Sequence, residues 1–227
     1  MSANQIIKDH DKWRKGAGGA KAGLSGESDG DSYAGLDLDL ITIASSRFDG
    51  SSFSSVTFKN ANWSSSHFAG VRFTGCDMAK LSITGCTFTN CTFSHCDMQG
   101  LTMTKCKLEG SNYDNCTMND SHMSDCTGGG GGGMSDCDMS GATMSGCTFT
   151  GATLAGAVYA GAQWTDCKFL GCTWKNLGFD NCQWTGLDIL DCHCDGIKGN
   201  GVKGEKVTYH GSFFENSEFR DSAINAG

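Results

Sequence analysis

The sequence predicts an all-β solenoid in which the chain winds through four-sided coils. Large apolar residues recur every five positions from Leu38 onward, a period that no helix can use. A small residue stands two positions before each of them, which is the alternation of a short strand with one buried face. Identical residues also recur at twenty positions, as in Cys76, Cys96 and Cys116. Four five-residue units therefore make one turn, and like side chains stack on like.

Each unit is predicted to be one short strand followed by a corner. We name the large apolar residue the centre and the small residue two positions earlier the minor site. The stretch 91–95, Cys-Thr-Phe-Ser-His, shows the pattern, and its last two positions have turn chemistry. Every Phe except Phe213, every Met except Met1 and every Trp except Trp13 is at a centre. The main core centres predicted in this way are Phe48, Phe53, Phe58, Phe68, Phe73, Met78, Phe88, Phe93, Met98, Tyr113, Met144, Phe149, Trp164, Phe169, Trp174, Phe179 and Trp184.

This pattern resembles that of the pentapeptide-repeat family over residues 36–227. The resemblance implies a right-handed quadrilateral parallel β-helix, here a solenoid of about nine four-sided coils, with centres and minor sites pointing inward. The chain departs from the family's commonest wording, Ala-Asp-Leu. It uses Cys, Ser or Ala at minor sites and Phe, Met, Trp or Leu at centres. The motif is specific for the fold and uninformative about activity.

Residues 1–15 precede the repeat and are predicted to form a short capping helix. Ile6, His10 and Trp13 stand at helical spacing with charged residues between them. We expect Ile6 and Trp13 to cover the first coil, whose strand edges and apolar interior need masking. A docking segment is the alternative interpretation. The wording from Ile7 to Leu24 resembles a leader that precedes many bacterial pentapeptide-repeat domains.

Residues 16–35 form a Gly- and Asp-rich lead-in, which we expect to be a loop or a poorly formed first coil. Its acidic residues are interpreted as solvated surface, because most of a calcium-loop motif is missing. The repeat domain at 36–227 is interrupted by six glycines at 128–133. Joining Thr127 directly to Met134 restores a regular unit. We therefore expect a mobile poly-Gly surface loop, of natural or engineered origin.

Composition restricts the partners and the compartment. The net charge of −8 argues against direct binding to nucleic acid or to an anionic membrane. No apolar run reaches the roughly 20 residues that span a bilayer, and charges interrupt the N-terminus where a signal peptide would be apolar. Thirteen of the 14 cysteines occupy minor sites, where Ala also occurs, so they are interpreted as free, buried filler. We expect a reducing, cytoplasmic location, with export without a signal peptide left open.

No catalytic, cofactor-binding or metal-binding residues are predicted. The stretch 192–194, Cys-His-Cys, suggests zinc, but strand alternation points both cysteines inward and His193 outward. The glycine run lacks the Lys and Ser or Thr of a phosphate loop. Large stacked centres also leave no room inside the coil for a substrate. An enzyme is therefore not expected.

Three functions are consistent with such a chain. The first is a non-catalytic protein–protein interaction scaffold with a partner of unknown identity. The second follows from the resemblance: some family members mimic duplex DNA and bind type II topoisomerases such as DNA gyrase. Mimicry needs a continuous acidic band, whereas here basic residues such as Arg72 and Lys107 are interspersed. The third, suggested only by the leader, is a structural or effector-associated module of a bacterial secretion system or phage.

The C-terminal end is the predicted interface. No helix follows the last repeats, and Ala226 and Gly227 offer little to cover them. A solenoid needs polar caps to stay monomeric. We therefore expect a homodimer through this end, formed by the centres Phe214, Phe219 and Ile224.

Overall fold

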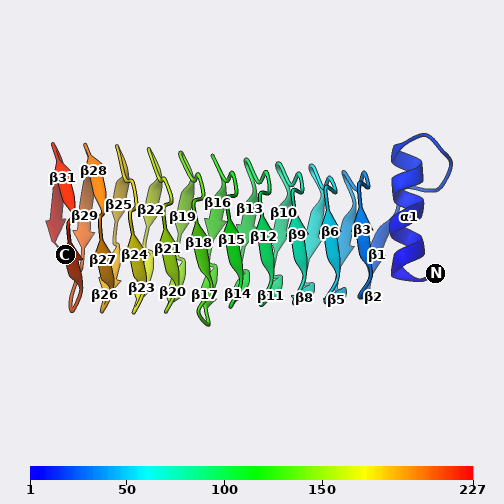
Figure 1. Ribbon diagram of the computed structural model, residues 1–227, viewed down its shortest axis with the longest axis horizontal. Coiled ribbons are helices and arrows are strands. Elements are labelled where there is room, and N and C mark those ends of the chain that lie inside the picture. Colours follow the sequence, from blue (N-terminus) through cyan, green and yellow to red (C-terminus); the bar gives the residue numbers. More distant parts are fainter. Residues whose placement is uncertain (227) are drawn as a thin grey trace.

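The computed structural model describes residues 1–226 and is an all-β parallel solenoid of about ten turns with one helix at its N-terminus. The coils follow one another along a single axis, with α1 at one end and β31 and β32 at the other (Figure 1). Four faces run along this axis. The turn count exceeds the nine expected, because the coil begins well before residue 36.

Three of the faces are continuous parallel sheets. Face A consists of β1 (Gly23–Ser25), β4 (Thr42–Ala44), β7 (Asn62–Ser64), β10 (Ser82–Thr84), β13 (Thr102–Thr104), β16 (His122–Ser124), β19 (Thr143–Ser145), β22 (Gln163–Thr165), β25 (Gln183–Thr185), β29 (Lys203–Val207) and β32 (Ala223–Ala226). Face B consists of β2 (Ser28–Asp29), β5 (Arg47–Asp49), β8 (His67–Ala69), β11 (Thr87–Thr89), β14 (Lys107–Glu109), β17 (Thr127–Gly129), β20 (Thr148–Thr150), β23 (Lys168–Leu170) and β26 (Asp188–Leu190).

Face C consists of β3 (Ser32–Ala34), β6 (Ser52–Ser54), β9 (Arg72–Thr74), β12 (Thr92–Ser94), β15 (Asn112–Asp114), β18 (Gly133–Ser135), β21 (Thr153–Ala155), β24 (Thr173–Lys175), β27 (His193–Asp195) and β30 (Phe213–Glu215). Face D is held by single parallel bridges from Asp37 to Lys198, followed by β28 (Lys198–Asn200) and β31 (Glu218–Arg220).

The five-residue unit folds as its chemistry demands. In β12 the side chain of Phe93 is buried and those of Thr92 and Ser94 are partly exposed. The corner residue His95 has φ 54°, a left-handed conformation that Gly, Asn and Asp occupy at most other corners. Its amide donates to Asp114 O of the next coil at 2.9 Å. Each coil is thus bonded to the next through its backbone.

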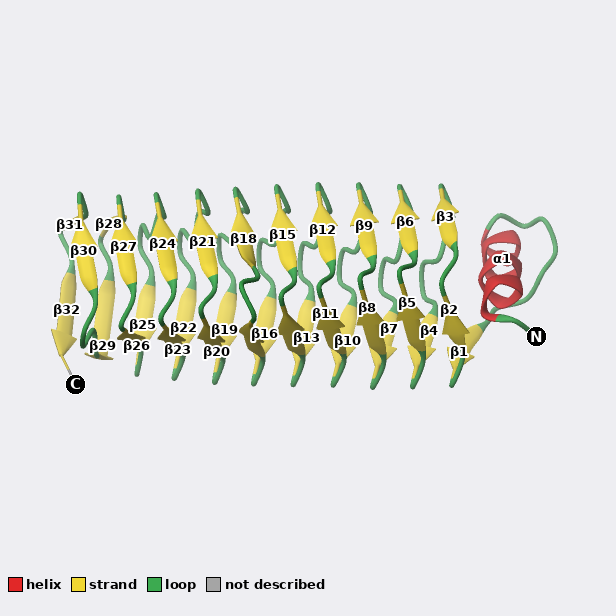
Figure 2. Ribbon diagram, turned by 60° about the horizontal axis from the view of Figure 1, so that its bottom comes forward, coloured by secondary structure: helices red, strands yellow, loops and turns green. Residues whose placement is uncertain are grey.

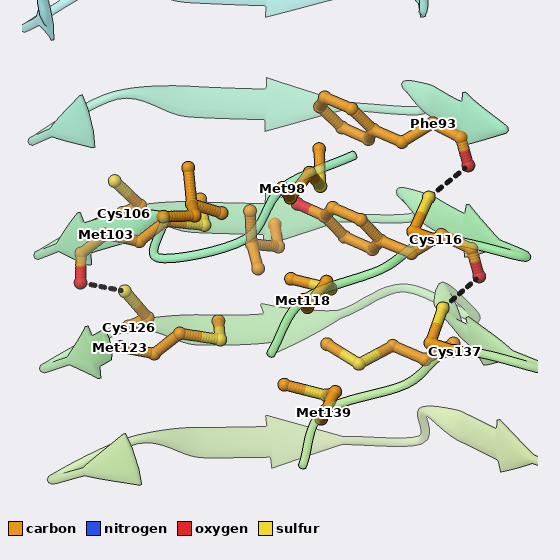
Figure 3. Close-up of a cluster of buried hydrophobic side chains, with 14 of the residues drawn as sticks. Phe93, Met98, Met103, Cys106, Cys116, Met118, Met123, Cys126, Cys137 and Met139 are labelled. Atoms are coloured by element: carbon orange, nitrogen blue, oxygen red, sulfur yellow. Dashed lines mark hydrogen bonds between the residues drawn. The ribbon is translucent and has the colours of Figure 1, made fainter. Parts of the chain in front are cut away.

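Like side chains stack along the interior. Phe73, Phe93 and Tyr113 form one column, with ring centroids 4.8 and 4.6 Å apart. Stacked thiols line other columns, and most of them donate to a carbonyl of the preceding coil. Cys116 Sγ donates to Phe93 O at 3.5 Å and Cys137 Sγ to Tyr113 O at 3.5 Å (Figure 3). All 14 cysteines are free and buried.

The helix α1 (Ala3–Arg14) covers the first coil, but not with the predicted side chains. Ala3, Ile7 and His10 are buried, whereas Ile6 and Trp13 are only half-buried. The Ala22 amide donates to His10 Nδ1 at 3.1 Å, and His10 Nε2 donates to Asp39 O at 3.0 Å. These backbone contacts turn the Ile7 side of the helix toward the coil.

The lead-in is more ordered than a loop. β1, β2 and β3 lie within it, and Leu24 and Tyr33 are buried at centre positions. Asp29 takes the remaining centre, where its Oδ1 accepts from Tyr33 Oη at 2.7 Å. A hydrogen bond to this carboxylate thus takes the place of the apolar contact that the repeat would make, and the solenoid starts at Gly23 instead of residue 36.

The predicted poly-Gly loop at 128–133 is wrong, because the glycines form part of the wall. Gly128 pairs with Leu108 in face B, and Gly133 pairs with Asn112 in face C. Leu108 and Gly128 are 20 positions apart, whereas Tyr113 and Met134 are 21 apart. The run therefore supplies a complete unit with a glycine centre plus one extra corner residue, Gly131.

The glycine centre leaves the interior underfilled. An ideal Cβ on Gly128 would lie 2.7 Å from Phe149 Cδ1, so the Phe149 ring occupies the space that a side chain there would need. A cavity of about 20 Å³ remains between Leu108, Tyr113 and Phe149.

Candidate interaction surface at the C-terminal end

The last coil presents its apolar interior to solvent. Tyr209 is 54% exposed and Phe214 39%, although both occupy centre positions, which along the middle of the solenoid are buried at every unit except that of Gly128. Phe213 is 68% exposed on the outer side of β30. No element lies beyond β30, β31 and β32 in the described chain, whereas α1 closes the opposite end (Figure 2).

Two glycine centres beneath the last coil deepen this end. Gly204 lies between Trp184 and Ile224 in face A, and Gly199 pairs with Phe219 in face D. Neither glycine fills the interior, so Phe219 reaches toward Trp184, with ring centroids 6.0 Å apart. A cavity of about 280 Å³ remains open there.

The wall is also irregular at this point. The register of β29 against β32 shifts between Gly204 and Val207, which is a β-bulge. An ideal Cβ on Gly204 would lie 2.9 Å from Val207 Cγ2, so the bulged residue packs against the glycine. This segment stays in the wall and leaves the end uncovered.

The charged groups lie at the rim of the end. Arg220 Nε and Glu218 Oε1 are 2.6 Å apart, and both side chains are exposed. The hydrogen bond from Arg220 lowers the pKa of Glu218 below its ordinary value. Inside the rim, burial raises the pKa of Cys194 to about 12, and this thiol lies directly beneath Phe214. The surface is thus an apolar floor with an ionic border.

The structure places the sequence-predicted residues in two groups. The three interface candidates, Phe214, Phe219 and Ile224, lie together around the cavity. The predicted core centres are all buried within the coil. Among them, Trp184 forms part of the wall of the C-terminal cavity, and Tyr113 and Phe149 border the small cavity beside Gly128. The full set is Phe48, Phe53, Phe58, Phe68, Phe73, Met78, Phe88, Phe93, Met98, Tyr113, Met144, Phe149, Trp164, Phe169, Trp174, Phe179 and Trp184.

Two exposed residues of this end were missing from the predicted interface. Tyr209 is the first centre after Gly199 and Gly204, so its position was readable from the repeat. Phe213 is the one Phe outside a centre, and that irregularity was the available signal. At 192–194, the two cysteines are buried and His193 is exposed, so these side chains do not converge.

Two models of known protein families match the repetitive part of the chain. A family model described as a pentapeptide repeat region matches residues 66–128, and a second, described as eight copies of pentapeptide repeats, matches residues 134–169. Residues 66–128 and 134–169 are thus pentapeptide repeats, the repeat of the pentapeptide-repeat family. The fold class expected for that family, a right-handed quadrilateral parallel β-helix with an N-terminal helix, is confirmed.

Solved structures of similar shape include pentapeptide-repeat proteins. Full-length QnrB1, a plasmid-mediated fluoroquinolone resistance protein, is 14% identical, with a TM-score of 0.52 over 85% of this chain and 93% of that chain. HetL, involved in heterocyst differentiation regulation in the cyanobacterium Nostoc, is 14% identical, with a TM-score of 0.49 over 99% and 97% of the two chains. At 14% identity, the likeness to QnrB1 shows a shared fold alone. No curated protein sequence matches the chain.

Proposed function

We propose that this pentapeptide-repeat protein is a non-catalytic interaction scaffold that associates through its C-terminal end, first of all with a second copy of itself. The observation that carries this proposal is the contrast between the two ends. Ala3, Ile7 and His10 close the first coil, whereas Tyr209, Phe213 and Phe214 expose apolar surface at the last. Contiguous exposed apolar surface with a polar border is typical of protein interfaces.

The capped N-terminus determines which copy-to-copy contact can form. A head-to-tail contact would need an open first coil, and α1 occupies that place. Only two C-terminal ends can meet, which gives a closed, isologous two-fold dimer instead of a filament.

The size of the end predicts a weak dimer. A side of five residues at roughly 3.3 Å per residue gives an end face of about 270 Å². Stable interfaces bury about 800 Å² per partner. We therefore expect reversible association in the micromolar range, strengthened where Phe213 extends the contact beyond the end face.

The packed interior supports a non-catalytic function. Ser94 Oγ and His95 Nδ1 lie 2.8 Å apart, but on an exposed corner of the solenoid. The cavity of about 280 Å³ at the C-terminal end has an apolar, aromatic lining, which offers no group to activate a nucleophile. Free buried thiols also favour a reducing compartment, and we place the protein in the cytoplasm on that ground. No helix among residues 1–226 is long and apolar enough to cross a membrane.

Mimicry of duplex DNA is less well supported. Face D holds its carboxylates in one column that is broken by threonines, in the order Asp37, Thr57, Asp77, Asp97, Thr117 and Asp138. Two of these carboxylates are also paired, Asp37 with Arg14 and Asp77 with Lys59. A broken, partly neutralised column is a poor substitute for a continuous phosphate backbone.

Sedimentation velocity of the full chain tests the dimer. We expect the sedimentation coefficient to rise from low to high micromolar concentration. Phe213→Glu should abolish the rise without disturbing the fold, since this side chain is exposed. Leu40→Glu replaces another exposed apolar side chain, near the opposite end, and should leave association intact. A monomer throughout the range, or equal effects of the two variants, would overturn the interface.

A further inference from the structure

Face A differs from the other faces in the chemistry of its outward side chains. Over eight consecutive strands, β4, β7, β10, β13, β16, β19, β22 and β25, every outward residue is Thr, Ser, Asn, Gln, Ala or His. These strands lie side by side along the axis (Figures 1 and 2). His122 is the one titratable side chain among them in the described chain. Charges reappear at the flanking corners, as at Lys105 and Asp166.

The same strand positions on the neighbouring faces carry charges. Face B has Arg47 and Lys107, face C has Arg72 and Lys175, and the face D column is acidic. The neutral strip on face A is therefore not a property of the repeat in general. A surface without charge discriminates against polyanions such as nucleic acid, because it offers no counterion release.

The strip also presents unused hydrogen-bonding groups. Gln163 and Gln183 are exposed in neighbouring coils. Their side-chain amide groups have no hydrogen-bond partner within residues 1–226. Thr84 and Thr165 are exposed as well. Ser124 Oγ donates to Thr104 Oγ1 at 3.2 Å, which shows that hydroxyls of successive coils lie within bonding distance. Hydroxyls and amides both donate and accept.

The dimensions of the strip select the partner. Eight strands at about 4.8 Å give a length of roughly 38 Å, and a three-residue strand gives a width of about 10 Å. The resulting area, about 400 Å², is half of what a stable protein interface buries on each partner. A narrow, straight, neutral strip with donors and acceptors at a regular spacing fits an extended polymer chain instead.

We propose that face A binds an extended, uncharged polysaccharide that lies along the solenoid axis. Sugar hydroxyls are donors and acceptors, and they recur along a β-linked chain at a repeat close to the rise per coil. Each coil then makes one or two weak hydrogen bonds, and affinity accumulates along the strip by multivalency. This site is separate from the C-terminal end and does not depend on dimerisation.

Depletion of the full chain from solution by insoluble polysaccharide tests this proposal. The probes are amorphous cellulose and chitin, with alginate as the charged comparison. We expect binding to at least one neutral probe and none to alginate. Thr84→Glu with Thr165→Glu places two charges on face A and should weaken binding about tenfold or more. Gln163→Ala with Gln183→Ala should also weaken it.

The matched control places the same charges elsewhere. Thr74→Glu with Thr150→Glu changes exposed threonines at the equivalent strand position of faces C and B, and binding should stay within about twofold. Phe213→Glu should also bind normally. No depletion by either neutral probe, equal losses from both threonine pairs, or preferential binding to alginate would overturn the proposal. Adsorption of the protein to ice without binding to polysaccharide would also overturn the proposal, and would identify ice as the ligand of face A.

Discussion

Asp125 and Gly146 occupy the same corner of the solenoid in successive coils, and the carboxylate of one fills the side-chain space of the other. An ideal Cβ on Gly146 would lie 2.7 Å from Asp125 Oδ1. Both residues are in the left-handed region, with φ 52° and 60°. Asp166 and Gly186 repeat this arrangement, as do Asp136 and Gly156. An acidic corner therefore requires glycine one coil later.

Gly146→Ala should cost more stability than Gly151→Ala. Both glycines have φ 60°, so both variants incur about 1 kcal/mol of left-handed strain. Only the first also meets Asp125, because no atom lies within 4 Å of a Cβ at Gly151. We expect a further loss of about 1–2 kcal/mol from this contact. Urea unfolding measures the difference, and adding Asp125→Ala to Gly146→Ala should recover it. Equal losses from the two single variants would show that Asp125 moves freely.

Phe93→Asp should unfold the neighbouring coils, whereas Ser94→Asp should be nearly silent. Phe93 is 1% exposed and stacks between Phe73 and Tyr113. An unpaired carboxylate there is buried without a partner. Ser94 points outward on the same strand. Phe93→Leu, which keeps an apolar centre, should cost about 1–2 kcal/mol. Thermal melts of the three variants check the inward and outward assignment, which equal destabilisation by both Asp variants would contradict.

The repeat predicts the interior well because every unit shows the same alternation of apolar inward and polar outward residues. A one-residue error of phase would bury Thr92 and Ser94 and expose Phe93, and this would recur in each coil. The same reasoning is weak where this alternation is interrupted. Asp29 stands at a centre position and interrupts the apolar pattern, so the sequence did not indicate the first coil. In the helix, Ile7 is buried where Ile6 was predicted to be, whereas His10 belongs to both the predicted and the observed stripe. Contacts with Ala22 and Asp39, distant in sequence, decide that choice.

The glycine run shows a second limit. Six identical residues carry no alternation, so the sequence cannot tell an inserted loop from a unit that lacks a side chain. Pairing with Leu108 and Asn112 in the preceding coil decides the matter. At the C-terminal end, the centres were predictable, but the depth of the cavity depends on how far Phe219 leans past Gly199.

Acidification should loosen the N-terminal helix through Asp37. Burial alone would raise the pKa of Asp37, but hydrogen bonds from Arg14 and from the Asp39 amide outweigh it and lower the pKa. A depressed pKa contributes stability above the unfolded value, about 3.9, and this is lost as the pH falls through the folded value. The pair is partly exposed and screened by solvent, so we expect only a small loss of stability.

Amide hydrogen exchange of α1 at neutral and acidic pH measures this effect. Asp37→Asn should speed exchange at neutral pH and have little further effect in acid. Asp97→Asn changes the same column of face D without an arginine partner and should leave α1 unchanged. If both variants act alike, the Arg14 contact does not hold the helix.

Deleting Gly131 alone should preserve or raise stability, because it removes the extra corner residue and restores a 20-residue coil. Gly131 has φ 79°, and no atom lies within 4 Å of its Cβ position, so no side chain packs over this corner. A shorter closed corner also loses less conformational entropy on folding. Thermal unfolding measures the effect, and a marked fall in melting temperature would show that the insertion relieves strain.

Deleting all six glycines should also yield a folded chain, but with its faces displaced. Met134 would take the place of Gly128 in face B, and every later unit would move by one face. After β16, face A would continue with β20, β23 and β26, the strands that now follow β17 in face B. Lys168 of β23 would then interrupt the neutral strip. Melting temperature should therefore change little in either deletion, whereas binding to neutral polysaccharide should fall only in the longer one. Equal binding by the two deletions would mean that a continuous strip along face A is not what the polymer recognises.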